Sequence, residues 1–219
     1  MTTFEPPVHD PEQQALGDRL LALGAATIGE SGGWAMRARV RAAWPGATVV
    51  GQAVTASCAP GDNLAIHVAT ATAPAGSVLV AETGDVTELG YWGEVLTTAA
   101  ETRGMRGLVI DAGVRDTAAL AEHRFGVFAT MTALRGATKV QPGTVGGAVA
   151  VGDVEVNPGD WVVGDSDGVV VVPAELLDEV MAAAEQRAAT EQRLFAALRA
   201  GNTTVDLLQL DATRITRLD

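Results

Sequence analysis

Residues 76–113 most strongly limit what this chain can fold into. "GSVLVAET" at 76–83 and "GLVIDAG" at 107–113 are short apolar runs of the kind that form buried strands. Between them, "GYWGEVLTTAAETRG" at 90–104 predicts a helix that starts after glycine and ends at Gly104. Two strands joined by a helix pair in parallel, with their carboxyl ends at the same edge of the sheet. The sequence therefore predicts an α/β fold.

The flanking segments extend this pattern and then change it. The predicted strands are 47–59 and 125–130, and the predicted helices are 14–24, 61–73 (opened by Asp62 or Asn63), 115–124 and 174–200. Glycine and Asp-Gly punctuate the valine-rich runs of 143–173, which indicates antiparallel hairpins. We expect an arm at 1–15, one domain at 16–200 and a tail at 201–219.

Composition excludes several classes of protein. The chain has 219 residues, 47% of them apolar, which is enough for a sizeable core. A net charge of −12, with 15 basic residues, argues against binding nucleic acid, because that affinity depends on neutralising phosphates. No apolar run reaches the roughly 18 residues that a membrane span needs. With a single cysteine, Cys58, no internal disulfide can form, and we expect a cytoplasmic protein.

Arg115 and Asp116 follow the strand of 107–113 directly. Adjacent opposite charges can form a surface ion pair that contributes about 0–1 kcal/mol, and Asp116 can cap the next helix. However, the carboxyl ends of parallel strands are also where α/β proteins usually bind ligands. Glu94 opens the preceding helix on the same side of the sheet, so Glu94 and Asp116 are predicted to face one crevice.

Other chemistry-bearing patterns are weak. The chain has no histidine cluster, no Cys-x-x-Cys and no phosphate-binding loop, which disfavours zinc and nucleotide chemistry. His67 lies one helical turn after Asn63, and a helix-packing or hydrogen-bonded histidine is preferred over a catalytic one.

Three segments together resemble a known family. "GDNLAIHVA", "GEVLTTAAETRGMRGLVIDAGVRD" and "PGDWVVGDSDGVVVVP" occur in the order and spacing of the RraA-like proteins, which include 4-hydroxy-4-methyl-2-oxoglutarate and 4-carboxy-4-hydroxy-2-oxoadipate aldolases. The resemblance covers about residues 45–200. The family's aldolases have an acidic residue, twenty further residues and then Arg-Asp, which Glu94, Arg115 and Asp116 reproduce. The sequence departs at Asp111-Ala112, where the family has Asp-Gly; here the glycine is Gly113.

The resemblance implies a site built around a divalent cation, Mg²⁺ or Mn²⁺. Asp116 would bind the metal directly, and Arg115 would hold the pyruvyl carboxylate or oxo group and stabilise enolate charge. The backbone N–H groups of Gly93, Val95 and Leu96 would take the carboxylate. Glu94 would orient a water on the metal or accept a proton through it. These are the chemical parts that Lewis-acid catalysis of a retro-aldol cleavage needs.

The resemblance also implies a fold, an assembly and a reaction. The fold would be a three-layer β/β/α swivelling domain with a long C-terminal helix. The assembly would be a homotrimer or homohexamer in which Glu191 of one subunit approaches the site of another. The reaction would be pyruvate aldolase cleavage of 4-hydroxy-2-oxo acids, with oxaloacetate decarboxylation as a side activity. Two alternatives stay open: a non-catalytic regulator of an RNA-degrading endonuclease, and a lyase on a different 2-oxo acid.

Overall fold

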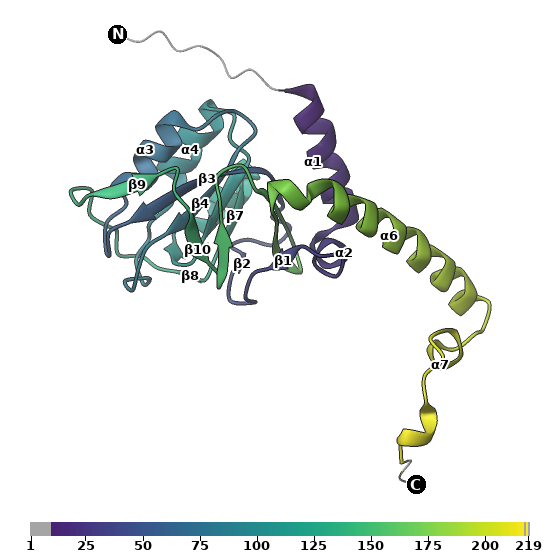
Figure 1. Cartoon of the computed structure of the whole chain (residues 1–219). Coiled ribbons are helices and arrows are strands. Elements are labelled where there is room, and N and C mark those ends of the chain that lie inside the picture. Colours follow the sequence, from purple (N-terminus) through teal and green to yellow (C-terminus); the bar gives the residue numbers. More distant parts are fainter. Residues whose placement is uncertain (1–9, 217, 219) are drawn as a thin grey trace.

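The predicted crossover order is present in the sheet. The computed structural model describes residues 10–216 and 218. Four strands lie side by side and parallel (Figure 1): β3 (Val49–Cys58), β4 (Val78–Glu82), β5 (Gly107–Ile110) and β7 (Gly126–Ala129). The helices that connect them in turn are α3 (Leu64–Thr72), α4 (Glu94–Thr102) and α5 (Thr117–His123). Loops at the carboxyl ends of these strands therefore meet at one edge of the sheet.

Antiparallel strands complete the curled sheet, as the glycine-punctuated valine runs predicted. The hairpin of β12 (Trp161–Asp165) and β13 (Gly168–Val172) pairs with the first half of β3. Three further antiparallel pairs add β1 (Trp34–Ala35) to β13, β2 (Arg41–Ala42) to β7 and β9 (Gly143–Val145) to β3. Two separate two-stranded sheets are formed by antiparallel β10 (Val149–Val151) and β11 (Val154–Val156) and by parallel β6 (Gly113–Val114) and β8 (Met131–Thr132).

Three apolar clusters hold the layers together. One packs α3, α4 and α5 on the parallel strands, and includes the fully buried Trp92 and Tyr91. A second joins the other face of the sheet to the β10–β11 hairpin. The third packs α1 (Pro11–Leu23), α2 (Ala25–Gly29) and α6 (Leu177–Arg199) against β12 and β13. This arrangement confirms the predicted β/β/α layers with a long C-terminal helix.

The predicted helices differ from the observed ones by a few residues at several ends, and two of the starts differ for a clear reason. The first helix begins at Pro11 instead of residue 14, because Asp10 caps it by accepting a hydrogen bond of 2.9 Å from the backbone N–H of Glu12. The helix predicted from residue 90 begins at Glu94. Residues 90–92 are extended instead, because Gly90 and Tyr91 donate backbone hydrogen bonds to Arg135 and Gly113. Residues 1–9 of the predicted arm lie outside the described residues.

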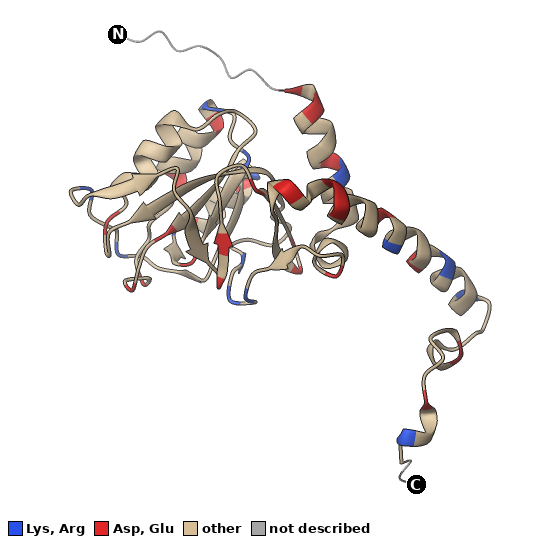
Figure 2. Ribbon diagram, in the orientation of Figure 1, with Lys and Arg blue, Asp and Glu red and all other residues tan. Residues whose placement is uncertain are grey.

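The C-terminal helix leaves the body of the molecule. A 3₁₀ turn (Ala174–Leu176) precedes α6, and α7 (Thr204–Leu207) and a second 3₁₀ turn (Ala212–Arg214) follow it. The C-terminal half of α6, α7 and the second 3₁₀ turn extend away from the sheet (Figure 1). Figure 2 shows basic and acidic segments mixed along α6. Among the described residues, no helix combines the length and apolarity that crossing a membrane requires.

Candidate functional site

Two buried aromatic residues position the segment before α4. The Tyr91 hydroxyl accepts a hydrogen bond of 3.0 Å from the Gly61 N–H and donates to the Val86 carbonyl. The indole of Trp92 stacks on Phe125 at 6.0 Å and donates to the Thr97 hydroxyl at 2.8 Å. Both side chains are at most 1% exposed. Gly93 and Glu94, the N-cap and first residue of α4, therefore directly follow a tightly packed segment.

Asp116 contacts the start of α4 across the crevice. Its backbone is left-handed, with φ 57° and ψ 35°, a conformation that aspartate tolerates better than most residues. Its Oδ2 accepts a hydrogen bond of 3.1 Å from the backbone N–H of Glu94. The Asp116 side chain does not cap α5, so the capping interpretation is wrong. The predicted meeting of the two segments is thus present, through the Glu94 backbone.

Arg115 lies in a slot lined by glycines. A Cβ built at Gly90 or Gly93 would lie 3.0 Å from an Arg115 side-chain carbon, and one at Gly136 would lie 3.3 Å from Nη1. The Arg115 backbone N–H donates to Trp92 at 2.9 Å. Its Nε lies 3.6 Å from Asp116 Oδ2, and the two side chains are 43% and 41% exposed. Both charges can therefore reach a ligand.

Position 113, where this chain has its glycine in place of position 112, has no room for a side chain. A Cβ at Gly113 would lie 2.6 Å from the Leu89 carbonyl and 2.7 Å from Ala133. Asp111 faces away from the site, where its two oxygens accept bonds of 3.1 and 2.7 Å from Arg39. This ion pair attaches the end of β5 to a distant loop and leaves Arg115 in the crevice.

A pocket of about 180 Å³ opens beside Arg115. Its walls come from α3, the segment before α4, the first turn of α4 and the loop after β8. The lining residues are Asn63, His67, Gly90, Tyr91, Trp92, Gly93, Val95, Leu96, Arg115, Gly136, Ala137 and Lys139. All the residues predicted to bind substrate line this one pocket.

Two buried polar atoms of this pocket have no partner among the described residues: Asn63 Oδ1 and His67 Nε2. Burial lowers the pKa of His67, and the Lys139 ammonium adds to this effect. Lys139 is the only lysine of the chain. His67 packs in the wall of this pocket, and its Nε2 has no hydrogen-bond partner among the described residues. Unpaired buried polar groups are costly, which makes them candidates for binding a ligand.

Asp62 holds the loop that carries Lys139 over the pocket. Its buried carboxylate accepts bonds from the N–H groups of Val140 (2.6 Å) and Gln141 (3.0 Å) and from the Thr138 hydroxyl (2.7 Å). Its other oxygen caps α3 through the N–H of Leu64 at 2.8 Å. Burial alone would raise the pKa of Asp62, but these hydrogen bonds hold it well below the ordinary value.

The carboxylate of Glu94 turns toward α5. Its Oε1 lies 3.7 Å from His123 Nε2, while His123 Nδ1 lies 2.8 Å from Glu101 Oε2. The bond to Glu101, and after it the Glu94 carboxylate, raises the pKa of His123 above its ordinary value. The contact between His123 and Glu94 could not be predicted from the sequence, because it depends on how α4 and α5 pack against each other.

Glu191 lies elsewhere in the chain, on the projecting part of α6. Its Oε1 pairs with Arg187 Nε at 3.1 Å, one helical turn away. Glu191 does not line the pocket beside Arg115. Within one chain, the structure does not bring Glu191 together with Glu94, Arg115 and Asp116.

The donor groups suit some metals better than others. Over residues 10–216 and 218, no group of three or more His, Cys, Asp or Glu side chains is arranged to hold a metal ion. A closed zinc site needs such a group. Mg²⁺ is commonly bound by one or two carboxylates together with waters and substrate oxygens. The half-exposed Asp116 carboxylate fits a cation of this second kind.

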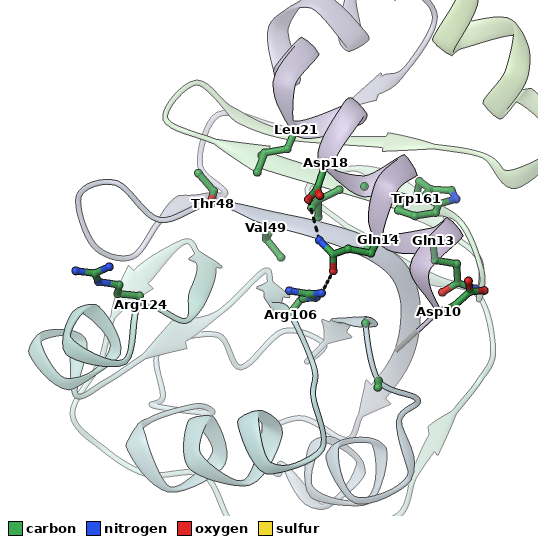
Figure 3. A pocket seen from close by; sticks show the side chains of 15 residues that line it. Asp10, Gln13, Gln14, Asp18, Leu21, Thr48, Val49, Arg106, Arg124 and Trp161 are labelled. Carbon is green, nitrogen blue, oxygen red and sulfur yellow. Dashed lines mark hydrogen bonds between the residues drawn. The ribbon is translucent and has the colours of Figure 1, made fainter. Parts of the chain in front are cut away.

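A larger cavity of about 240 Å³ lies between α1 and the amino-terminal ends of the parallel strands (Figure 3). There Arg106 donates to Gln14, which in turn donates to Asp18 at 2.8 Å. Arg106, Gln14 and Asp18 thus bond one another across this cavity, in contrast to the unpaired atoms beside Arg115.

The fold and this site together define a class: an α/β protein with a small cationic pocket at the edge of a curled sheet, beside the accessible carboxylates of Asp116 and Glu94. The family described as "RraA-like: Aldolase/RraA" matches residues 22–171, about two thirds of the chain. The chain belongs to the RraA-like family. The match includes Glu94, Arg115 and Asp116 and excludes Glu191.

Known relatives are similar over most of this range. A protein of Halalkalibacterium halodurans named "Putative 4-hydroxy-4-methyl-2-oxoglutarate aldolase" is 34% identical over 145 residues, which are 66% of this chain and 69% of that protein. An uncharacterized protein of Pseudomonas syringae pv. tomato has a similar structure, with a TM-score of 0.73 and 25% identity over 91% of this chain and 97% of that one.

A third relative has a different described role. Streptomyces coelicolor RraAS2 is described as an unusual member of the RNase ES inhibitor RraA protein family. Its TM-score is 0.72 at 26% identity, over 88% of this chain and all of that one. The family thus contains proteins named as aldolases and proteins named as inhibitors.

Proposed function

We propose that this protein is a divalent-metal-dependent pyruvate aldolase acting on 4-hydroxy-2-oxo acids such as 4-hydroxy-4-methyl-2-oxoglutarate. The observation that carries the proposal is the pocket beside Arg115: cationic in a protein of net charge −12, lined by unpaired polar atoms, and adjacent to the Asp116 carboxylate. The name of the Halalkalibacterium halodurans relative supports the same reaction.

Arg115 and the start of α4 are suited to hold the pyruvyl end of the substrate. The first N–H groups of a helix have no partner within the helix, so those of Val95 and Leu96 can bind a carboxylate. The Arg115 guanidinium adds two parallel donors for the carboxylate or oxo oxygen. The same charge stabilises the enolate that forms when the C3–C4 bond breaks.

Lys139 and His67 line another part of the pocket, on different elements from Arg115. 4-Hydroxy-4-methyl-2-oxoglutarate and oxaloacetate each carry a second carboxylate. The Lys139 ammonium is suited to pair with it, and the unbonded Nε2 of His67 is suited to a hydrogen bond. A substrate with only one carboxylate would leave these groups unsatisfied.

Asp116 is the residue we assign to the metal, Mg²⁺ or Mn²⁺, since both ions prefer oxygen ligands. When bound, the ion supplies a Lewis acid that polarises the 2-oxo group. The Glu94 N–H and Arg115 hold the Asp116 carboxylate in orientation. Glu94 accepts the proton of the C4 hydroxyl through a water, and this proton loss starts cleavage of the C3–C4 bond.

Pyruvate release tests this proposal. The protein is assayed with 4-hydroxy-4-methyl-2-oxoglutarate and with oxaloacetate, with lactate dehydrogenase as coupling enzyme, in Mg²⁺ or Mn²⁺ and then in excess EDTA. Metal-dependent release from the hydroxy acid is the expected result. Release from oxaloacetate alone would support enolate chemistry in this site, but it would mean that the natural substrate is a different 2-oxo acid. No release from either, with correctly folded protein, would reject the aldolase in favour of an endonuclease inhibitor like the Streptomyces coelicolor relative.

We further propose that sites are shared between subunits of a cytoplasmic homotrimer or homohexamer. The projecting half of α6 carries Glu191 out of its own chain's body, where it can approach a neighbour's Asp116 (Figure 1). Mixing inactive E191A and D116N proteins, after dissociation and reassembly, should restore activity in about a quarter of the sites, those with both groups intact. Persistent inactivity of the mixture would place Glu191 outside the site.

A further inference from the structure

We propose that His123 is a positioning residue that fixes the Glu94 carboxylate at the site, and that Glu101 fixes His123 in turn. The inference rests on the proposed function, because it assigns Glu94 a task in proton transfer. It adds two residues that the acidic-Arg-Asp pattern does not contain. His123 lies on α5 and Glu101 near the end of α4, both outside the pocket lining.

The geometry is a three-group chain across two helices. Glu94 and Glu101 are seven residues apart on α4, about two turns, so they lie on one side of that helix. His123, the last residue of α5, faces both of them. Its Nδ1 is 2.8 Å from Glu101 Oε2, a full hydrogen bond, and its Nε2 is 3.7 Å from Glu94 Oε1.

Glu101 determines which imidazole nitrogen faces Glu94. A carboxylate that accepts from Nδ1–H fixes the orientation of the ring, and in the imidazolium form the Nε2–H is then a donor directed at Glu94. The Nδ1 bond to Glu101 therefore directs Nε2 at Glu94. The helix ends favour the same charges, because an imidazolium is stabilised at the C-terminus of α5 and a carboxylate at the N-terminus of α4.

Glu94 needs such a partner because its own side chain is loosely held. Its backbone N–H is fixed by Asp116 at 3.1 Å, but its carboxylate is 57% exposed and has three rotatable side-chain bonds. A shift of about 1 Å in a reacting group can cost on the order of 100-fold in rate. By restricting the Glu94 rotamers, His123 keeps the carboxylate at a constant distance from Asp116.

A double-mutant cycle tests this role by metal-dependent pyruvate release. H123A should lower kcat by about 10-fold with KM within about twofold, because Arg115 and the pocket are unchanged. In an E94A background the same H123A change should alter kcat by less than about twofold. If H123A costs the same with and without Glu94, His123 acts on the fold generally and the proposal is overturned.

Three further variants separate the effects. E122Q removes an exposed carboxylate from the same helix and should keep wild-type kinetics. H123Q retains a donor toward Glu94 and should recover part of the kcat that H123A loses. E101Q should lower kcat in the same direction as H123A. An unchanged kcat in both E101Q and H123A would contradict the proposed chain, whatever the thermal stability of the variants.

The His123 contact also has a test that needs no activity. The His123 imidazole is titrated by NMR in the wild type, E101Q and E94A. Its pKa should fall toward the ordinary value in each variant, and an unchanged pKa in E94A would remove the contact with Glu94. If the wild type releases no pyruvate, the aldolase proposal fails alone, and this titration still decides whether His123 holds Glu94.

Discussion

Replacing Gly93 with alanine should disable the site without unfolding the protein. The Gly93 backbone is extended, so alanine can adopt its conformation. However, the new Cβ would lie 2.4 Å from Asp116 Oδ2 and 3.0 Å from an Arg115 side-chain carbon. Ordinary contact begins near 3.4 Å, so the Asp116 carboxylate must withdraw by about 1 Å. Both neighbours are flexible side chains, and the body of the fold can stay in place.

G93A should lower the activity of the protein much more than its stability. Moving Asp116 by about 1 Å breaks its 3.1 Å bond to the Glu94 N–H and displaces the proposed metal ligand, so kcat/KM should fall on the order of 100-fold. Stability changes little, because the lost hydrogen bond, worth about 1 kcal/mol, is opposed by the about 0.4–1 kcal/mol that Gly→Ala gains through the unfolded chain.

Two measurements decide this prediction. The coupled assay with 4-hydroxy-4-methyl-2-oxoglutarate gives kcat/KM, and thermal unfolding gives Tm. G147A is the matched control, because a Cβ at Gly147 meets no atom within 4 Å. Full activity of G93A would show that Asp116 need not occupy its present position. A large fall in Tm would show that the neighbouring backbone, and not the two side chains, resists the methyl group.

Three other substitutions probe separate parts of the site. D116N should lower metal-dependent kcat by about 100-fold or more at unchanged Tm, and near-normal turnover would remove Asp116 from the metal site. R115K keeps the charge and loses the paired donors, so KM for the 2-oxo acid should rise about 10-fold or more; an unchanged KM would place carboxylate recognition elsewhere. D62N should destabilise the chain by about 2 kcal/mol near neutral pH, as measured by urea unfolding. Because folding lowers the pKa of Asp62, its contribution is present above about pH 5 and is lost as the pH falls below about 4. A D62N penalty that stays the same at pH 3 would refute this.

The sequence by itself determined the architecture and the two segments of the site. Strand-helix-strand order favours a parallel crossover, and glycine-punctuated valine runs favour hairpins, so local patterns predicted both. The same rule predicted that Glu94 and Asp116 would open on one edge of the sheet. The spacing of Glu94, Arg115 and Asp116 resembled that of the family to which the chain belongs.

Only the tertiary structure decided how the side chains use that edge. The Asp116 carboxylate could have capped α5, but it reaches the Glu94 N–H because its left-handed backbone turns it across the crevice. Lys139 and His67 are 72 residues apart and share a pocket because buried Asp62, at the start of α3, holds the loop that carries Lys139. His123 meets Glu94 because α4 and α5 pack side by side. Such contacts depend on where distant segments pack, which no local pattern of residues specifies.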